Sequence, residues 1–378
     1  MPLNSIRVGK PTLWCLILAF AAAMPSLARG EEDGTSRWLL VSMQKQRAIV
    51  TFRRDESASA TLTRVASTPC SAEPAIMCAA RDGRRVFVSY RSSGQLASYQ
   101  LDATSGQLSL LSVTEGGADP AYLQLDRSER YLLSAYYVDN KVAVHRIDGG
   151  RLSSQPVQVV STAPRAHGIA IDASNKLVFV THTGANRIYQ FRFDADQGLL
   201  SAAEPPFVGT PESDHPRHIQ LHPNDRWAYA NNEAGDSLSM YELDRETAQL
   251  TRRQTCSTLP EDAGDPSQNS TARCEMTPDG RFIYVANRGH DSLAGFAIDA
   301  TSGRMTPLGQ FPTEKTPRSF TIEPRGRFLY AAGQGNGKIA SYRIERDGRL
   351  ALLGSITLES ASETPSVPWA VLAVDQRR

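Results

Sequence analysis

The chain has 378 residues, of which 40% are hydrophobic and 7% aromatic, with 27 glycines and 22 prolines. Lys and Arg total 41 against 40 Asp and Glu, so the chain lacks the basic excess with which nucleic-acid-binding proteins neutralise phosphates. The length permits several ordinary domains or one large β-domain, and the internal pattern must decide between them.

The first 28 residues have the pattern of an export signal. Two basic residues precede an apolar stretch at 13–24, and small residues follow it up to Ala28. This stretch is shorter than the ~20 residues that cross a bilayer, which disfavours a membrane anchor. We therefore expect cleavage after Ala28 or Gly30, a short linker at 29–35, and a mature chain that is periplasmic or extracellular and free of the membrane.

A basic residue followed by a short β-rich run recurs seven times along the rest of the chain. These marker residues stand at spacings of 47, 46, 46, 50, 55 and 46, and they are Arg37, Arg84, Arg130, Lys176, Arg226, Arg281 and Arg327. A turn rich in Asp, Asn and Gly precedes most markers, and two further strands separated by another turn follow. Four antiparallel strands in each of seven units predict an all-β, seven-bladed β-propeller.

The two ends of the chain complement each other. The first unit begins at its second strand, near Trp38, and the last segment, 368–375, has the pattern of the missing first strand. We expect this C-terminal strand to pair with the N-terminal blade and close the ring, because an open ring exposes sheet edges that aggregate. The propeller then spans 36–375, and 376–378 form a tail.

Four cysteines follow the export signal: Cys70, Cys78, Cys256 and Cys274. An even number in an oxidising compartment favours disulfides, and the pairings nearest in sequence are Cys70–Cys78 and Cys256–Cys274. Four buried thiols are the alternative, and the sequence leaves the pairing open.

Equivalent positions of the units can be compared by counting from each marker. Nine residues before it, where each inner strand starts, stand Ala75, Ala121, His167, Arg217, Ala272 and Arg318, with Trp369 in the closing strand. Seven residues after it, where each second strand ends, stand Gln44, Arg91, Tyr137, Thr183, Glu233, Arg288 and Gln334. Antiparallel pairing brings both sets to one mouth of the channel.

The charged members of these two sets concentrate in blades four to seven, whereas the corresponding places in blades two and three are largely small or neutral. A cleft that combines an imidazole, a carboxylate and several guanidinium groups can bind an anionic substrate and hydrolyse an ester. Solvated ion pairs at the rim are the alternative interpretation.

Four segments resemble the lactonase family that includes the bacterial 6-phosphogluconolactonases. They are 163–175, 215–233 (HPRHIQLHPNDRWAYANNE), 277–293 (TPDGRFIYVANRGHDSL) and 313–334, and the likeness extends from about Ser36 to Asp375. The resemblance implies a catalytic quartet in the cleft, which maps to His167, Arg217, Glu233 and Arg288. We expect Arg318, His218 and Trp369 to bind the substrate.

The predicted reaction is hydrolysis of a sugar or organic-acid lactone without a metal or cofactor. Glu233 or His167 would act as general base towards water, and Arg217 or Arg288 would stabilise the oxyanion. An export signal fits poorly with a cytosolic phosphosugar lactone, which favours another lactone as the substrate. The only expected partner is this small molecule, and we expect a monomer or a weak homo-oligomer.

Two other classes of protein are alternatives. An exported propeller that acts as a binding or cell-surface scaffold has similar repeats, but a scaffold has no reason to gather His, Arg and Glu at matched positions. A metal-dependent lactonase of the gluconolactonase type needs several oxygen ligands, and only Glu233 is acidic at the two compared positions. The cluster of His215, His218 and His222 is not expected to bind a metal, because a strand turns neighbours to opposite faces.

Overall fold

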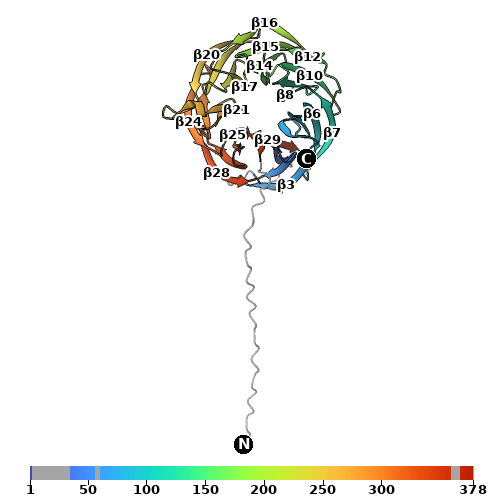
Figure 1. Cartoon of the computed structure of the whole chain (residues 1–378). Helices are drawn as coiled ribbons and strands as arrows, with labels where there is room; N and C mark the ends of the chain where they lie inside the picture. The colour runs from blue at the N-terminus through green and yellow to red at the C-terminus, as the bar shows by residue number, and fades with distance from the viewer. Residues whose placement is uncertain (2–34, 56–59, 359–366, 378) are drawn as a thin grey trace. The chain divides into compact units, whose positions relative to one another are not determined.

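The structure is a computed structural model that describes residue 1 and residues 35–55, 60–358 and 367–377. Residues 34–378 form one compact unit, in which seven antiparallel sheets surround a central axis (Figure 1). The expected export signal lies outside the described residues. Within the described ranges, no helix is long and apolar enough to cross a membrane.

Each sheet is one blade, and its strands follow one another from the channel outwards. Blade 1 has β29 (Pro368–Arg377), β1 (Thr35–Met43), β2 (Ala48–Arg54) and β3 (Leu62–Pro69). Blade 2 has β4 (Pro74–Ala79), β5 (Arg85–Tyr90), β6 (Gln95–Leu101) and β7 (Leu108–Glu115). Blade 3 has β8 (Pro120–Leu125), β9 (Tyr131–Tyr136) and β10 (Lys141–Asp148), with an outer strand in two pieces, β11 (Arg151–Leu152) and β12 (Gln158–Ser161).

The other four blades have the same order. Blade 4 has β13 (Ala166–Ile171), β14 (Leu177–His182), β15 (Arg187–Asp194) and β16 (Leu199–Gly209). Blade 5 has β17 (Pro216–Leu221), β18 (Trp227–Asn232), β19 (Ser237–Asp244) and β20 (Gln249–Ser257). Blade 6, entered through the 3₁₀ turn Pro266–Gln268, has β21 (Ser270–Met276), β22 (Phe282–Arg288), β23 (Ser292–Ile298) and β24 (Met305–Pro312). Blade 7 has β25 (Pro317–Ile322), β26 (Phe328–Gly333), β27 (Lys338–Ile344) and β28 (Leu350–Thr357).

The predicted turns before the markers have a common backbone geometry. In blades 2 to 7 the residue just before the marker has a positive φ, between 54° and 75°; these residues are Gly83, Glu129, Asn175, Asp225, Gly280 and Gly326. Gly, Asn and Asp adopt this left-handed conformation most readily, which explains why they dominate the turns in the sequence.

The core is divided between the blades. Seven clusters of buried side chains lie one at each junction of neighbouring blades, and the junction of blades 7 and 1 has its own cluster. Five blades place an aromatic ring three residues after the marker, and all five rings are buried: Phe87, Phe179, Tyr229, Tyr284 and Tyr330. Burial of each such ring stabilises its junction by roughly 1.5–3 kcal/mol. The position that repeats in the sequence is therefore one that packs between blades.

The predicted closure of the ring is confirmed. Strand β29 pairs antiparallel with β1, from Thr35 opposite Arg377 to Ser42 opposite Ala370. The paired strands extend slightly beyond the expected limits of the propeller. Gln376, expected in the tail, is buried, accepts a hydrogen bond from Trp38 Nε1 at 3.3 Å and donates to the carbonyl of Leu101 at 3.0 Å.

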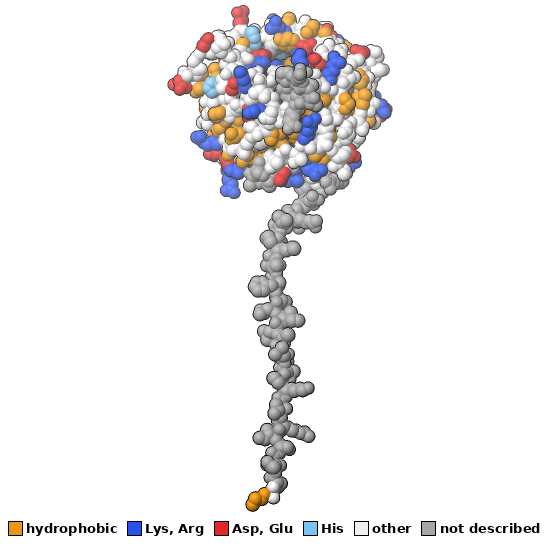
Figure 2. Space-filling view, turned by 60° about the horizontal axis from the view of Figure 1, so that its bottom comes forward, with side chains coloured by type: hydrophobic (Ala, Val, Ile, Leu, Met, Phe, Trp, Pro, Cys, Tyr) orange, Lys and Arg blue, Asp and Glu red, His pale blue; other side chains and the backbone are white. Residues whose placement is uncertain are grey.

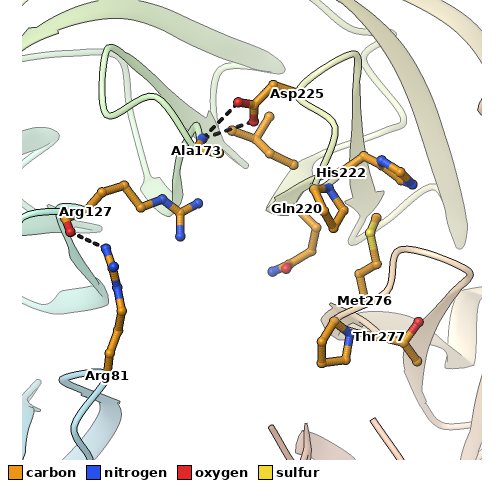
Figure 3. Close-up of a pocket in the computed structure, with 11 residues that line it drawn as sticks. Arg81, Arg127, Ala173, Gln220, His222, Asp225, Met276 and Thr277 are labelled. Atoms are coloured by element: carbon orange, nitrogen blue, oxygen red, sulfur yellow. Dashed lines mark hydrogen bonds between the residues drawn. The ribbon is translucent and has the colours of Figure 1, made fainter. Parts of the chain in front are cut away.

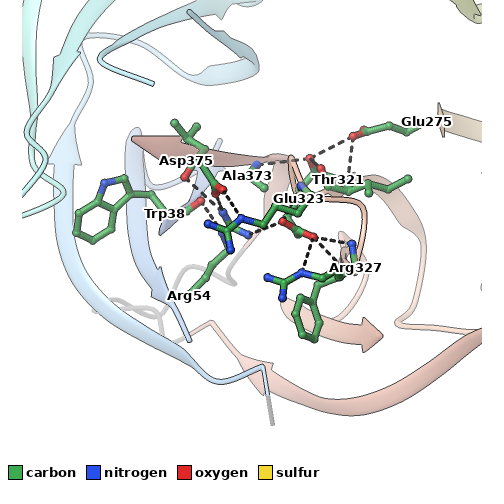
Figure 4. A network of polar contacts seen from close by, with 12 residues as sticks. Trp38, Arg54, Glu275, Thr321, Glu323, Arg327, Ala373 and Asp375 are labelled. Carbon is green, nitrogen blue, oxygen red and sulfur yellow. Dashed lines mark hydrogen bonds and ion pairs between the residues drawn. The ribbon is translucent and has the colours of Figure 1, made fainter. Parts of the chain in front are cut away.

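A buried ionic network holds this closure together (Figure 4). The side chain of Arg54, on β2, is fully buried and is ion-paired with Asp375 on β29, while its Nη1 lies 4.0 Å from Oε2 of Glu323. Its Nε donates to the carbonyl of Trp38 at 3.0 Å. Glu323 is also fully buried and accepts hydrogen bonds from the backbone N–H groups of the turn after β25, including that of Arg327 at 2.6 Å. The first blade is thereby tied to the seventh.

The expected disulfides are not formed. Cys70, Cys78, Cys256 and Cys274 are all free thiols, which matches the alternative of four separate buried or half-buried cysteines. Cys70 packs in the core between blades 1 and 2, and its Sγ accepts from the Tyr99 hydroxyl at 3.8 Å. Cys78 packs instead at the junction of blades 2 and 3. The two cysteines are therefore separated, because Cys70 follows the outer strand β3 of blade 1 while Cys78 lies on the inner strand β4 of blade 2 and packs towards blade 3.

The surface reflects the balanced composition. On the face shown in Figure 2, basic and acidic side chains are interspersed around the ring, with small apolar patches between them. A broad field of one sign would steer a charged macromolecule, and this face does not present one.

Candidate active site

One backbone irregularity repeats at the start of every inner strand. The pairing of the inner strand with its neighbour skips one or two residues there, as where Ala166 faces His182 but Gly168 faces Thr181. The skipped residues include Ala75, Ala121, His167, Arg217, Ala272, Arg318 and Trp369. A bulge re-aims the side chain of its extra residue. The counted residues Ala121, His167, Arg217, Arg318 and Trp369 line a hollow in the channel, whereas in blades 2 and 6 the second skipped residue, Ile76 or Arg273, lines it in place of the counted alanine.

The bulges build a narrow, polar hollow in the channel. His167, Arg217, Arg318 and Trp369 line it, together with His218, and its volume of about 20 Å³ admits about one water molecule. The rings of His167 and His218 lie 5.1 Å apart between centroids, and Tyr137 meets His167 edge-on at 5.8 Å. Both histidines are almost fully buried, and their Nδ1 atoms have no hydrogen-bond partner among the described residues.

A carboxylate held between two guanidinium groups lies beside this hollow. Glu233, just after β18, accepts a hydrogen bond from Arg288 Nη2 at 2.5 Å, and its other oxygen lies 3.4 Å from Arg217 Nε. Arg288 also donates to the carbonyl of Thr271 at 3.1 Å, and Arg217 donates to the carbonyl of Ala272. Three of the four expected catalytic residues therefore form one ionic cluster, and Arg217 connects it to His218 at 3.3 Å.

The seventh blade and the closing strand supply an aromatic platform. The guanidinium carbon of Arg318 lies 3.9 Å from the centroid of a Trp369 ring, and that of Arg91 lies 5.5 Å from it. Arg318 has no ion pair and no hydrogen bond among the described residues, whereas Arg91 is bound by both oxygens of Asp119. An unpaired, largely buried guanidinium is costly unless an anion completes it.

The charged groups of this mouth extend beyond blades 4 to 7, where the compared positions concentrate them. Arg91 of blade 2 and Asp119 of blade 3 belong to the same mouth, and Arg91 lines the hollow with the others. Arg91 is the one charged residue at the compared positions of blades 2 and 3. Asp119 lies two residues before the bulge of its blade, and the same place holds Arg165, His215 and Thr316, all with positive φ. Counting eleven residues back from the markers would have found this third set.

The electrostatic environment sets the protonation of these groups. Burial, together with the charges of Arg217 and other arginines, holds the pKa of His167 and of His218 well below the ordinary imidazole value, so both rings are neutral at pH 7. Burial raises the pKa of Glu233, but Arg217 and Arg288 outweigh it and the net pKa is lowered. Burial, partly offset by Glu233, lowers the pKa of Arg217 to about 9. At neutral pH the site thus combines an ionised carboxylate with neutral imidazoles.

A larger cavity opens above the carboxylate. We call it the mouth cavity; its volume is about 380 Å³, and its lining includes Tyr137, Arg165, Thr183, His215, Glu233, Pro266, Ser267, Asn269 and Ser270. Pro266, Ser267 and Asn269 belong to the connection between β20 and β21, which accounts for the longest marker spacing, 55 residues. Asn269 anchors that connection by donating to Asp236 at 2.7 Å and accepting from the His290 backbone at 3.0 Å. The cavity has the size of a small-molecule site.

The other end of the inner strands opens on a second hollow, of about 450 Å³ (Figure 3). Its main polar side chains already have partners. Arg127 donates to the carbonyls of Ile171 and Asp172 at 2.6 and 3.0 Å, and Asp225 accepts from the backbone N–H of Ala173. These contacts stabilise the turns between blades. The candidate site is therefore at the opposite end of the channel, where the narrow hollow and the mouth cavity lie.

The three histidines within residues 215–222 line three different cavities. His218 lines the narrow hollow, His215 the mouth cavity and His222 the hollow at the opposite end. Within the described residues, no group of three or more His, Cys, Asp or Glu side chains is arranged to hold a metal ion.

The fold and the sequence together place this protein in the class of seven-bladed propellers that hydrolyse lactones. The family model "Lactonase, 7-bladed beta-propeller" matches residues 38–365. The 6-phosphogluconolactonase of Pectobacterium carotovorum subsp. carotovorum (strain PC1) is 30% identical over 70% of this chain and 77% of its own length, and that of Enterobacter sp. (strain 638) is 30% identical over 72% and 80%. The chain belongs to this lactonase family and is a lactone-hydrolysing enzyme.

Solved structures agree with this assignment. The periplasmic gluconolactonase of Pseudomonas aeruginosa superimposes with a TM-score of 0.79 at 26% identity, covering 90% of this chain and 99% of that one. A protein of Bacteroides fragilis NCTC 9343 gives a TM-score of 0.79 at 23% identity over 90% and 98%, which supports the fold alone. The matches favour the enzyme over the alternative of an exported scaffold.

Proposed function

We propose that this protein hydrolyses a sugar or organic-acid lactone at the mouth formed by blades 2 to 7, with Glu233 as the group that activates water. One observation carries the proposal: the carboxylate of Glu233 lines the mouth cavity while two guanidinium groups hold it ionised. A water bound to this carboxylate can attack a lactone carbonyl that lies in the cavity.

Glu233 is a better candidate for the base than His167. The Glu233 side chain keeps 26% of its surface exposed, whereas His167 is 4% exposed. A general base must come within hydrogen-bond reach of the water from which it takes the proton. His167 is neutral and lines the narrow hollow, so it is suited to accept or relay a proton behind the reacting centre.

Arg288 is suited to stabilise the oxyanion. Its Nε and Nη2 have acceptors, whereas its Nη1 has none among the described residues and is available to the substrate. Arg217 is more deeply buried, and its contacts with Glu233 and Ala272 fit a positioning role. A donor placed where negative charge develops is typically worth 10²–10³ in kcat.

Arg318 and Trp369 are proposed to bind the substrate, beside His218. The narrow hollow admits about one water molecule, so the unpaired guanidinium of Arg318 would meet the carboxylate that hydrolysis creates through a bridging water, and the Trp369 ring would hold that guanidinium in place. The proposed reaction uses neither metal nor cofactor. This is supported by the composition of the site, where each carboxylate is paired with guanidinium groups, Glu233 with Arg217 and Arg288 and Asp119 with Arg91, because hard cations select several oxygen ligands.

We further propose that the enzyme acts outside the cytosol. The export-signal pattern of residues 1–28 supports this, and so does the likeness to a periplasmic gluconolactonase. The substrate would then be a lactone of that compartment. N-terminal sequencing of the protein from a periplasmic fraction tests the proposal, and a chain that retains residues 1–28 and stays in the cytosol would contradict it.

The activity itself is tested with the purified mature chain against sugar and organic-acid δ-lactones, with spontaneous hydrolysis subtracted. We expect hydrolysis of at least one lactone, at the same rate with and without chelator. Loss of activity on chelation, with full recovery on adding a divalent cation, would overturn the metal-independent mechanism.

A further inference from the structure

One guanidinium on the rim of the mouth cavity has no part in the proposed reaction. Arg165 lines the same cavity as Glu233 and is exposed. Among the described residues it has no carboxylate within ion-pairing distance, whereas Arg91 has Asp119 and Arg288 has Glu233. The rim therefore carries a positive charge that the described part of the protein leaves uncompensated.

The position of Arg165 is fixed by its surroundings. Its backbone adopts φ 61°, and its N–H donates to the side chain of Asn140 at 2.9 Å. Its guanidinium carbon lies 5.7 Å from the centroid of the Tyr137 ring, and the guanidinium of Arg91 lies 5.9 Å from the same ring. Such a cation–π contact restrains a long side chain that would otherwise be free in solvent.

Two kinds of group line the mouth cavity. Glu233 and Arg165 both belong to its lining, and the volume of about 380 Å³ suits a whole small-molecule substrate. The narrow hollow, at about 20 Å³, is too small to take a phosphate. A charged substituent of a lactone bound beside Glu233 therefore lies in the same cavity as Arg165.

We propose that Arg165 determines specificity by binding an anionic group, phosphate or carboxylate, at the end of the substrate remote from the lactone carbonyl. This inference rests on the proposed function. A guanidinium presents paired N–H donors that match the oxygens of either anion. The preferred substrate is accordingly a hydroxylated lactone with a charged terminus.

Steady-state kinetics with three δ-lactones tests the assignment: 6-phosphoglucono-δ-lactone, a glucaric acid lactone with a free carboxylate, and neutral glucono-δ-lactone. In Arg165→Met we expect KM for at least one anionic lactone to rise about tenfold, with kcat within twofold of wild type and the neutral lactone unaffected. The anion that shows the larger rise identifies the source of the charge. Arg165→Lys, which keeps the charge but not the paired donors, should restore part of the loss.

A charge effect has a second signature. In the wild type, KM for the anionic lactone should rise with added salt, because an exposed charge pair is screened, and this dependence should shrink in Arg165→Met. Arg226→Met is the matched control: Arg226 is also exposed and lies 4.9 Å from a Trp227 ring, but away from the mouth cavity. The Arg226→Met variant should have the wild-type KM for all three lactones.

The outcomes separate the two proposals. Wild-type hydrolysis of an anionic lactone with an unchanged KM in Arg165→Met, or an equal rise for all three lactones, overturns the role of Arg165 alone. Hydrolysis of the neutral lactone only also overturns it. A wild-type enzyme that hydrolyses no lactone overturns the proposed function, and the role of Arg165 with it.

Discussion

Arg288 donates a hydrogen bond from Nη2 to Oε1 of Glu233 over 2.5 Å, and this contact joins blade 6 to blade 5 at the mouth of the channel. Arg217 stands 3.4 Å from the other carboxylate oxygen. A carboxylate so held is ionised, oriented and still reachable from the mouth cavity. The two arginines therefore make Glu233 less basic but hold it in a fixed position, which suits a group that orients water.

Replacing Glu233 by Gln keeps the shape of the side chain and removes its charge. We expect kcat on the best lactone to fall by about 10²–10⁴, the usual contribution of a positioned base. Thermal unfolding measured in parallel should show an intact fold. Glu242→Gln is the control, since Glu242 pairs with Arg253 on the exposed surface. A wild-type rate in the Glu233→Gln variant would exclude Glu233 as the base.

The pH dependence of the rate distinguishes this site from one with an ordinary imidazole base. The pKa of Glu233 is lowered and that of His167 lies well below its usual value, so both stay deprotonated as the pH falls. We expect kcat/KM to stay level from pH 7 down to about 5. Initial rates in short assays measure this. An acid limb near pH 6.5 would point instead to a histidine of ordinary pKa.

Two buried histidines outside the site make the fold sensitive to acid. Burial lowers the pKa of His145 and of His182 to about 4 in the folded chain, against ~6.5 in the unfolded one. The unfolded chain then binds more protons below pH 6.5. The stability should therefore fall as the pH drops from about 6.5 to about 4, by up to roughly 3 kcal/mol for each histidine.

Urea unfolding at several pH values measures this loss. His182→Phe, which keeps a ring against Tyr189, and His145→Leu should each flatten the curve between pH 6.5 and 4.5. His290→Asn serves as control because His290 is exposed. A slope that is unchanged in both core variants would assign the acid sensitivity to other groups.

The sequence predicted the ring and much of the site because both repeat. The bulge recurs at one place in every blade, so counting from the markers reached His167, Arg217 and Arg318. Contacts between blades have no such period. The pairing of Arg91 with Asp119 and the rim position of Arg165 depend on how neighbouring loops meet, which one sequence does not reveal. The preference for disulfides is wrong for the same reason, since Cys70 and Cys78 lie at different junctions.

The sequence also did not reveal the buried ionic network at the closure, because its members are far apart along the chain. Arg54 and Asp375 of blade 1 are 321 residues apart, and Arg54 reaches blade 7 through Glu323. Arg54→Met keeps much of the volume but leaves Glu323 and Asp375 without their buried cation. Removing one partner of a buried ion pair typically costs about 3–5 kcal/mol. We expect a loss of that size in the free energy of unfolding, measured in urea at pH 7.

Arg53→Met provides the matched control for this variant. Arg53 is the preceding residue on β2 and is exposed. Its guanidinium carbon lies 5.8 Å from the centroid of the Trp38 ring. Its replacement should cost less than about 1 kcal/mol. Equal losses in the two variants would mean that the closure depends on the strand pairing of β1 with β29, with no separate contribution from the buried charges. A large loss in Arg54→Met alone, relieved by adding Glu323→Gln, would show that the ionic network stabilises the ring, because the second substitution removes the charge that the first leaves unpaired.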